Sequence, residues 1–187
     1  MSNIYVFRHG KTSFNEDQKY IGLMDVSLNS NGVKEAKALR EKLRGKTIDL
    51  AYTSPLLRAK QTLNVVLQSH DESRVISYHL LQERDFGIVT GFYKERLEEL
   101  FPDINSNSIK NQWDYNTHQG ESFTDLEKKL FPFLDLITYQ SSVEKMNIAI
   151  STHIDPLRII RKYFEGLSNE EAMAINNKNC ELISYKR

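Results

Sequence analysis

Five ionisable side chains in this sequence follow predicted β-strands closely, and together they could perform chemistry. Two guanidinium groups suit a tetrahedral dianion, because their forked N–H groups bind its oxygens in pairs, and an imidazolium adds a further donor. A neutral imidazole nitrogen can attack a phosphoryl group held in this way. One carboxyl group can protonate the leaving group and later deprotonate a water molecule. The five side chains are Arg8, His9, Arg58, Glu83 and His153.

The elements predicted around these side chains alternate between short strands and longer helices. Such alternation favours a parallel sheet with both faces covered. We therefore expect an α/β fold, a three-layer α/β/α sandwich with a mostly parallel central sheet. The carboxyl ends of parallel strands meet at one edge, which would bring the five side chains together. The predicted strands span 4–7, 48–52, 74–80, 147–151 and 182–185.

Capping residues mark the starts of the predicted helices. The helix from about 122 to 139 contains Pro132, which should kink or split it, because proline removes a helical hydrogen bond. A short helix is expected over 94–101, whereas residues 103–119 are polar and weakly patterned. The candidate capping residues are Asn29, Ser54, Ser122, Asp155 and Ser168.

Length and composition limit the class of protein. The chain has 187 residues, of which 40% are hydrophobic, and we expect a single domain over 1–187. Lys and Arg number 25 and Asp and Glu also 25, so there is no basic excess to favour nucleic-acid or membrane partners. The one cysteine, Cys180, suits a reducing compartment. We therefore expect a cytoplasmic protein.

Five motifs in order along the chain carry a resemblance to a known family. They are IYVFRHGKTSFN (4–15), TSPLLRAKQT (53–62), ERDFGIVTG (83–91), Gly120-Glu121-Ser122 and ISTH (150–153). Together they resemble the motifs of the histidine phosphatase superfamily, also called phosphoglycerate mutase-like, and they extend over nearly the whole chain. This resemblance implies the phosphoglycerate mutase-like α/β fold.

The resemblance also implies roles for the five side chains. His9 would be the phosphorylated nucleophile, and Glu83 would be the proton donor and acceptor. No metal or organic cofactor is implied for a phosphatase of this family. The phosphate pocket that the resemblance implies comprises Arg8, Asn15, the Gly22 backbone, Arg58 and His153.

The substrate is expected to be a small phosphorylated metabolite, because the segment 84–120 is long enough to form a pocket or a lid. Within it, Arg84, Tyr93 and Lys94 are candidates for contacts with the substrate. The spacing of Lys94 resembles the mutases of the family more than its general phosphatases.

Two positions depart from the family pattern. Lys11 stands where most members have Glu, and Ile154 stands where many have Gly. The main interpretation is a metal-independent phosphatase. The nearest alternative is a phosphoglycerate mutase-type transferase, for which 2,3-bisphosphoglycerate would be a primer. A protein phosphohistidine phosphatase and a non-catalytic phosphate-binding module are further alternatives.

Overall fold

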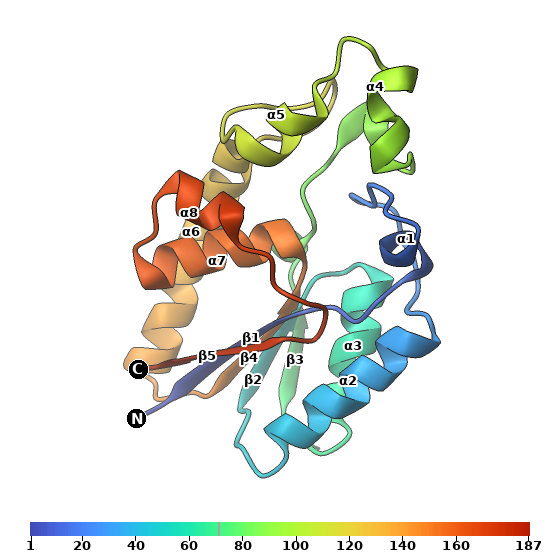
Figure 1. Ribbon diagram of the computed structural model, residues 1–187. Coiled ribbons are helices and arrows are strands. Elements are labelled where there is room, and N and C mark those ends of the chain that lie inside the picture. Colours follow the sequence, from blue (N-terminus) through green and yellow to red (C-terminus); the bar gives the residue numbers. More distant parts are fainter. Residues whose placement is uncertain (71) are drawn as a thin grey trace.

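A mostly parallel sheet lies at the centre of the molecule (Figure 1). The computed structural model describes residues 1–70 and 72–187, and five strands of that part of the chain form the sheet in the order β3-β2-β4-β1-β5. Only β5 runs antiparallel to its neighbour, β1. The predicted α/β class is therefore confirmed. The strands are β1 Asn3–Arg8, β2 Leu50–Thr53, β3 Arg74–Ser77, β4 Ile148–Thr152 and β5 Leu182–Lys186.

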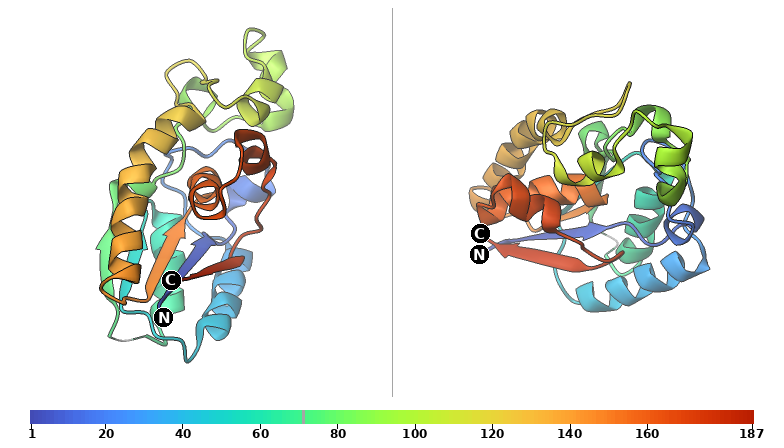
Figure 2. Two further views of the ribbon diagram at one scale, coloured as in Figure 1. Left: turned by 90° about the vertical axis from the view of Figure 1, so that its left-hand side faces the viewer. Right: turned by 45° about the horizontal axis from the view of Figure 1, so that its top comes forward.

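Helices cover both faces of this sheet, which gives three layers (Figure 2). The inner strand β4 shows why: Ala149 packs into the hydrophobic cluster beneath α2 and α3, whereas Ile148 and Ile150 pack beneath α6 and α7. None of the described helices is long and apolar enough to cross a membrane. The α-helices are α1 Ser13–Glu16, α2 Ser30–Leu43, α3 Leu57–Leu67, α4 Leu97–Leu100, α5 Ser106–Asn111, α6 Phe123–Ser142, α7 Ile154–Glu165 and α8 Asn169–Ala174.

A third hydrophobic cluster lies outside the sheet layers and includes Tyr20, Val89, Leu97 and Ile109. This cluster is the hydrophobic core of the segment that contains α4 and α5, which Figure 1 shows in green at one end of the molecule. Three short 3₁₀ helices, His79–Leu81, Gly87–Val89 and Lys94–Arg96, connect β3 to this segment and lie within it.

Three predicted N-caps are confirmed, because their side chains accept a backbone N–H of the first helical turn: Asn29, Ser122 and Ser168. The cap predicted at Ser54 is wrong. Helix α3 begins two residues later than expected, after Leu56, because the buried Ser54 hydroxyl accepts the Leu56 N–H and caps a turn before the helix.

The cap predicted at Asp155 is also wrong. Helix α7 begins at Ile154, with His153 at the N-cap position and no side-chain cap. The carboxylate of Asp155 is instead bound by two arginines, Arg84 and Arg158.

Other differences concern the ends and continuity of elements. Helix α6 is not split at Pro132, which lies on the solvent side, where water can satisfy the exposed Lys128 carbonyl group. The strand predicted over 74–80 ends at Ser77, and the helix predicted over 94–101 is a 3₁₀ turn followed by one α-helical turn. Residues 103–119 contain α5, whose polar sequence gave no helical period.

Candidate active site

His9 and His153 meet because they follow neighbouring strands. Strands β1 and β4 pair in parallel, with Arg8 opposite Thr152, and the His9 N–H donates to the Thr152 carbonyl oxygen at 2.9 Å. The two imidazole rings are almost fully buried, and their centroids lie 5.1 Å apart. The carboxyl edge of the sheet therefore carries a pair of adjacent histidines.

Arg58 joins the two histidines from helix α3. Its Nε donates to Nε2 of His9 at 3.3 Å and to Nδ1 of His153 at 3.2 Å. Its Nη1 and Nη2 donate to the carbonyl oxygens of Met24 and Gly22, at 2.7 and 2.9 Å. The side chain is fully buried. The Gly22 backbone thus acts on the site through Arg58, because its carbonyl group orients the guanidinium.

These contacts determine where the imidazole protons lie. Nδ1 of His9 faces the Gly10 carbonyl oxygen at 2.7 Å, and because a carbonyl only accepts, Nδ1 carries the proton and Nε2 keeps its lone pair. Nδ1 of His153 accepts from Arg58, which leaves the proton of the neutral ring on Nε2. Among the described residues, that Nε2 has no hydrogen-bond partner.

Both histidines are held neutral. Burial, followed by the nearby charges of Arg58 and Arg8, lowers the pKa of His9 well below its usual value. Burial and Arg58 also lower the pKa of His153, with smaller effects from His9 and Arg8. A neutral His9 whose Nε2 carries no proton has the protonation state that a nucleophile requires.

Glu83 follows the first 3₁₀ helix and is buried beside this pair. Its Oε1 accepts the backbone N–H groups of Arg84 and Asp155 at 3.1 and 3.2 Å. Two donors on Oε1 leave Oε2 as the oxygen that carries a proton in the neutral form. Burial, then the charge of Asp155, raises the pKa of Glu83, while Arg58 and Arg8 oppose this. The buried environment therefore favours the protonated carboxyl group.

His9, Glu83 and Arg8 line a cavity of about 50 Å³, whereas Arg58 and His153 lie next to His9 and do not line it. Arg8 contributes an Nε that is buried without a partner among the described residues, while its Nη1 donates to the Asn177 carbonyl oxygen at 3.2 Å. Arg8 and Glu83 thus face one space with His9, beside Arg58 and His153. The cavity is lined by Arg8, His9, Asn15, Lys19, Tyr20, Ile21, Glu83, Phe86, Lys94 and Ile154.

A larger cavity of about 200 Å³ adjoins the first and shares part of its wall, including Arg8, Tyr20 and Lys94. Its remaining wall is rich in cations and contains one carboxylate. These further lining residues are Arg84, Ile109, Lys110, Asp155, Arg158 and Asn176. The combined space is positively charged on several sides, as binding of an anionic molecule requires.

Of the four remaining residues predicted from the sequence to contact the substrate, three line the cavities and one does not. Asn15 and Lys94 line the smaller cavity, and Arg84 lines the larger one, where it is paired with Asp155. Tyr93 lines neither; it is partly exposed, and its ring lies 4.3 Å from the Lys19 ammonium group.

Several lining residues were not identified from the sequence. Lys19, Tyr20 and Arg158 lie in no motif of the resemblance, and Phe86, although it lies in the motif over 83–91, was not a candidate. Arg158 could have been found, because it stands three residues after Asp155 on a predicted helix, a spacing that pairs opposite charges. Phe86 could have been found from its place in the motif over 83–91, whereas Tyr20 carries no comparable signal.

The loop that carries His9 is packed closely against the start of α2. A Cβ atom on Gly10 would lie 2.5 Å from the Gly32 carbonyl oxygen, so no larger residue fits at Gly10 without a backbone shift. Lys11, which departs from the family pattern, points to α2: its N–H donates to Glu35 at 2.9 Å, and its ammonium group lies 3.9 Å from the same side chain. It does not line either cavity.

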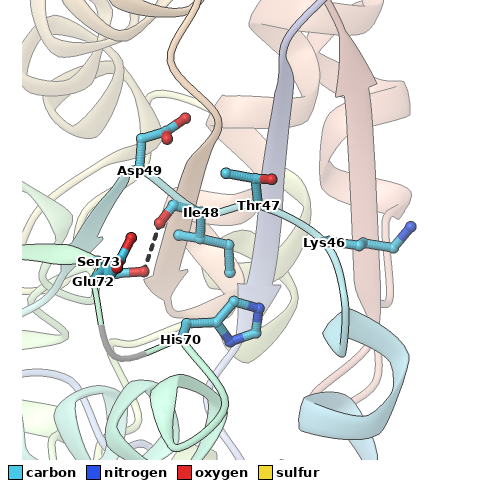
Figure 3. A pocket seen from close by; sticks show the side chains of 7 residues that line it. All are labelled: Lys46, Thr47, Ile48, Asp49, His70, Glu72 and Ser73. Carbon is cyan, nitrogen blue, oxygen red and sulfur yellow. Dashed lines mark hydrogen bonds between the residues drawn. The ribbon is translucent and has the colours of Figure 1, made fainter.

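Another pocket, of about 310 Å³, lies at the amino ends of β2 and β3 (Figure 3). The Ser73 hydroxyl there donates to the Ile48 carbonyl oxygen at 2.6 Å. His70 lies in this pocket, and its Nδ1 and Nε2 face the carbonyl oxygens of Val66 and Leu43. The pocket contains none of the five candidate residues. In the part of the chain that the structure describes, no group of three His, Cys, Asp or Glu side chains is placed to hold a metal ion.

Comparisons with known proteins extend over the whole chain. The sequence profile of the histidine phosphatase superfamily (branch 1) matches residues 4–187. The chain is 25% identical to a 2,3-bisphosphoglycerate-dependent phosphoglycerate mutase of Methanosarcina acetivorans, over 99% of this chain and 91% of that protein. It is 27% identical to the enzyme of the same name from Parvibaculum lavamentivorans, over 100% of this chain and 91% of that protein.

Solved structures with the same fold include two phosphatases. A mycobacterial glucosyl-3-phosphoglycerate phosphatase superposes with a TM-score of 0.86 at 19% identity, over 98% of this chain and 90% of that one. The alpha-ribazole phosphatase of Shigella flexneri superposes with a TM-score of 0.84 at 24% identity, over 97% of this chain and 89% of that one.

Proposed function

The chain belongs to the histidine phosphatase superfamily, and on that premise we propose that it hydrolyses a phosphomonoester of a small metabolite through a phosphohistidine on His9. The observation that carries this proposal is that His9 and Glu83 line one small cavity together with Arg8, while Arg58 and His153 contact His9. His9 would be the nucleophile, Glu83 the proton donor, and Arg8, Arg58 and His153 three potential ligands of the phosphoryl group.

In the first step, the lone pair on Nε2 of His9 forms a bond to phosphorus. The bond from phosphorus to the leaving oxygen breaks, and that oxygen takes the proton from Oε2 of Glu83. The products are an alcohol, a phosphorylated His9 and a Glu83 carboxylate. The raised pKa of Glu83 supports this step, because a buried, protonated carboxyl group can act as a general acid near neutral pH.

In the second step, water attacks the phosphoryl group and Glu83 accepts the proton that the water loses. The bond from Nε2 to phosphorus breaks, inorganic phosphate leaves, and both His9 and Glu83 return to their starting states. One carboxyl group therefore serves both steps, as acid and then as base.

The charge on the phosphoryl oxygens would be held by buried donors. The Nε of Arg8 and the Nε2–H of His153 have no partner among the described residues, and Arg58 lies between the histidines. Buried donors without partners are costly, so an anion that accepts from them gains binding energy. These donors and the neutral His9 supply the chemistry without a metal or an organic cofactor, and we propose none.

The dimensions of the site support a small substrate. The two cavities, of about 50 and 200 Å³, are walled by Tyr20 and Phe86 as well as by charged side chains. We propose a free phosphorylated metabolite rather than a nucleic acid or a membrane lipid as the substrate. The balanced charge of the chain supports this choice of substrate. The single cysteine favours a reducing compartment, and we propose the cytoplasm.

A phosphoglycerate mutase is the second candidate. The curated relatives with this name support it, and so does Lys94, which lines both cavities where a second anionic group of the substrate would lie. In that reaction the phosphoryl group on His9 would pass to another hydroxyl group instead of to water, after priming by 2,3-bisphosphoglycerate.

One assay separates the two candidates. The purified chain is incubated with 3-phosphoglycerate, with and without 2,3-bisphosphoglycerate, and both phosphate release and formation of 2-phosphoglycerate are measured. A panel of phosphorylated metabolites and p-nitrophenyl phosphate is tested alongside at pH 5 to 8. The proposal predicts phosphate release from at least one substrate that exceeds any isomer exchange. Bisphosphate-dependent exchange that outpaces release would establish the mutase, and neither release nor exchange with any compound would indicate a binding module.

A further inference from the structure

Asp155 is a buried carboxylate between two arginines, at the edge of the proposed active site. Its Oδ2 accepts from Nε of Arg84 at 2.8 Å, and its Oδ1 accepts from Nη1 of Arg158 at 2.8 Å. The Asp155 and Arg84 side chains are only 2% and 3% exposed. Burial of this kind is tolerated only because each charge has a partner.

The two guanidinium groups are also fixed from other sides. Nη2 of Arg84 donates to the Ile109 carbonyl oxygen of α5 at 2.9 Å. Nε and Nη2 of Arg158 donate to the Ile175 carbonyl oxygen at 3.0 and 2.9 Å. The cations would therefore stay near the site even if the carboxylate between them lost its charge.

The same cluster holds Glu83 directly. The backbone N–H of Asp155 donates to Oε1 of Glu83, and so does the backbone N–H of Arg84. A change in the charge of Asp155 would therefore act on Glu83 over a short distance and through a buried medium, where charges interact strongly.

We propose that Asp155 is a positioning residue for Glu83: by neutralising Arg84 and Arg158, it keeps the Glu83 carboxyl group protonated and ready to donate to the leaving oxygen. This inference rests on the proposed function, in which Glu83 is the general acid. Asp155 itself is not the acid, because its two arginines hold its pKa below the usual value despite its burial.

The charges around Glu83 explain why the contribution of Asp155 matters. Burial and Asp155 raise the pKa of Glu83, whereas the cations nearby favour its carboxylate form. The two histidines beside it are neutral. The charged groups that act on Glu83 from other elements are Arg8 of β1, Arg58 of α3, Lys94 of the third 3₁₀ helix and Asp155 of α7, and Asp155 is itself paired with Arg84 and Arg158. Without the negative charge of Asp155, the positive charges around Glu83 would favour its carboxylate form.

Two substitutions should move the protonation of Glu83 in opposite directions. Asp155→Asn removes the negative charge and leaves two uncompensated guanidinium groups, so Glu83 should lose its proton at lower pH. Arg158→Gln removes one cation and leaves Asp155 paired with Arg84, so Glu83 should keep its proton to higher pH. Glu165→Gln, which removes a carboxylate from the far end of the same helix, is the matched control.

The measurement is the NMR titration of the Glu83 carboxyl carbon in the full chain labelled with ¹³C-glutamate, with the signal assigned from Glu83→Gln. We expect a titration midpoint at lower pH in Asp155→Asn, at higher pH in Arg158→Gln, and unchanged in Glu165→Gln. Unchanged midpoints in both cluster variants, with loss of thermal stability only, would overturn the inference and make the cluster purely structural. If Asp155→Asn does not fold, the Arg158→Gln variant tests the inference alone: a midpoint at higher pH supports it, and an unchanged or lower midpoint overturns it.

Activity separates this inference from the proposed function. Asp155→Asn should hydrolyse an alkyl phosphate about tenfold more slowly at pH 7 and recover part of that loss at lower pH, because the general acid is restored. The expected midpoint shifts without any phosphatase activity in the unchanged chain would refute the function and leave the control of Glu83 by Asp155 intact. Phosphatase activity with no midpoint shift would refute only the inference.

Discussion

The Nε of Arg58 lies 3.3 Å from Nε2 of His9, so the guanidinium group donates to the nitrogen that we propose as the nucleophile. Attack on phosphorus needs the lone pair that this hydrogen bond occupies. A phosphoryl oxygen that accepts the Arg58 N–H would release the lone pair at the moment when the anion binds. In the proposed reaction, this contact would link anion binding to exposure of the nucleophile.

Arg58→Lys should therefore reduce kcat/KM by about 100-fold or more, because an ammonium group cannot place one N–H between the two histidines while other N–H groups are held by the Met24 and Gly22 carbonyl oxygens. We also expect a loss of about 1–3 kcal/mol in the free energy of unfolding, since the Gly22 and Met24 carbonyl groups lose buried partners. Steady-state kinetics and urea denaturation check the two effects.

Arg44→Lys, on the exposed end of α2, is the control for this substitution and should leave both quantities unchanged. Near-normal kcat/KM in Arg58→Lys would mean that only a positive charge, and not the guanidinium geometry, is needed at this position.

Glu83→Gln should slow alkyl phosphates much more than activated aryl phosphates, because only a poor leaving group needs a proton. The difference should reach about 10²–10³-fold in kcat, within the range of general acid catalysis. The measurement is a plot of log kcat against the pKa of the leaving alcohol, which should be steeper in the variant. Equal losses for both substrate classes would contradict the role of Glu83 as the acid.

The burial of His153 should appear in the pH dependence of stability. The unfolded chain protonates this histidine below about pH 6.5, whereas burial and Arg58 keep the folded form neutral to much lower pH. The unfolded state then binds more protons, so the free energy of unfolding falls as the pH falls below about 6.5.

Urea denaturation at pH 7, 6 and 5 tests this in the unchanged chain and in His153→Gln. The variant should lose about 2 kcal/mol less than the unchanged chain between pH 7 and pH 5, because it lacks this titrating group. Parallel losses in the two proteins would show that His153 does not stay neutral in the fold.

The fold class could be predicted because the signals for it are local. The strands β1 and β4 have apolar centres, at 4–7 and 148–150, and His9 and His153 directly follow their last residues. Once those strands are parallel neighbours, their carboxyl ends have to meet, and the two histidines with them. The position of Arg58 at the same edge of the sheet could be predicted in the same way, since it lies in the first turn of the helix after β2.

What the sequence did not predict depends on contacts between distant segments. Asp155 was expected as a helix cap, but its carboxylate meets Arg84, a residue from another part of the chain, and no local pattern indicates that pair. Tyr20 reaches the cavities through the packing of a loop against Phe86, their ring centroids 4.9 Å apart. Helix α5 is too short to show a periodic pattern.

The central claim is that His9 carries the phosphoryl group, and trapping that intermediate tests it most directly. The chain is mixed with a ³²P-labelled substrate identified in the metabolite panel and quenched in alkali within the first turnover. We predict a label on the protein that is stable in base and labile in acid, located in the peptide containing His9, absent from His9→Ala and retained in the exposed-site control His79→Ala. Phosphate release by a chain that carries no such label, or a label that persists in His9→Ala, would contradict the account.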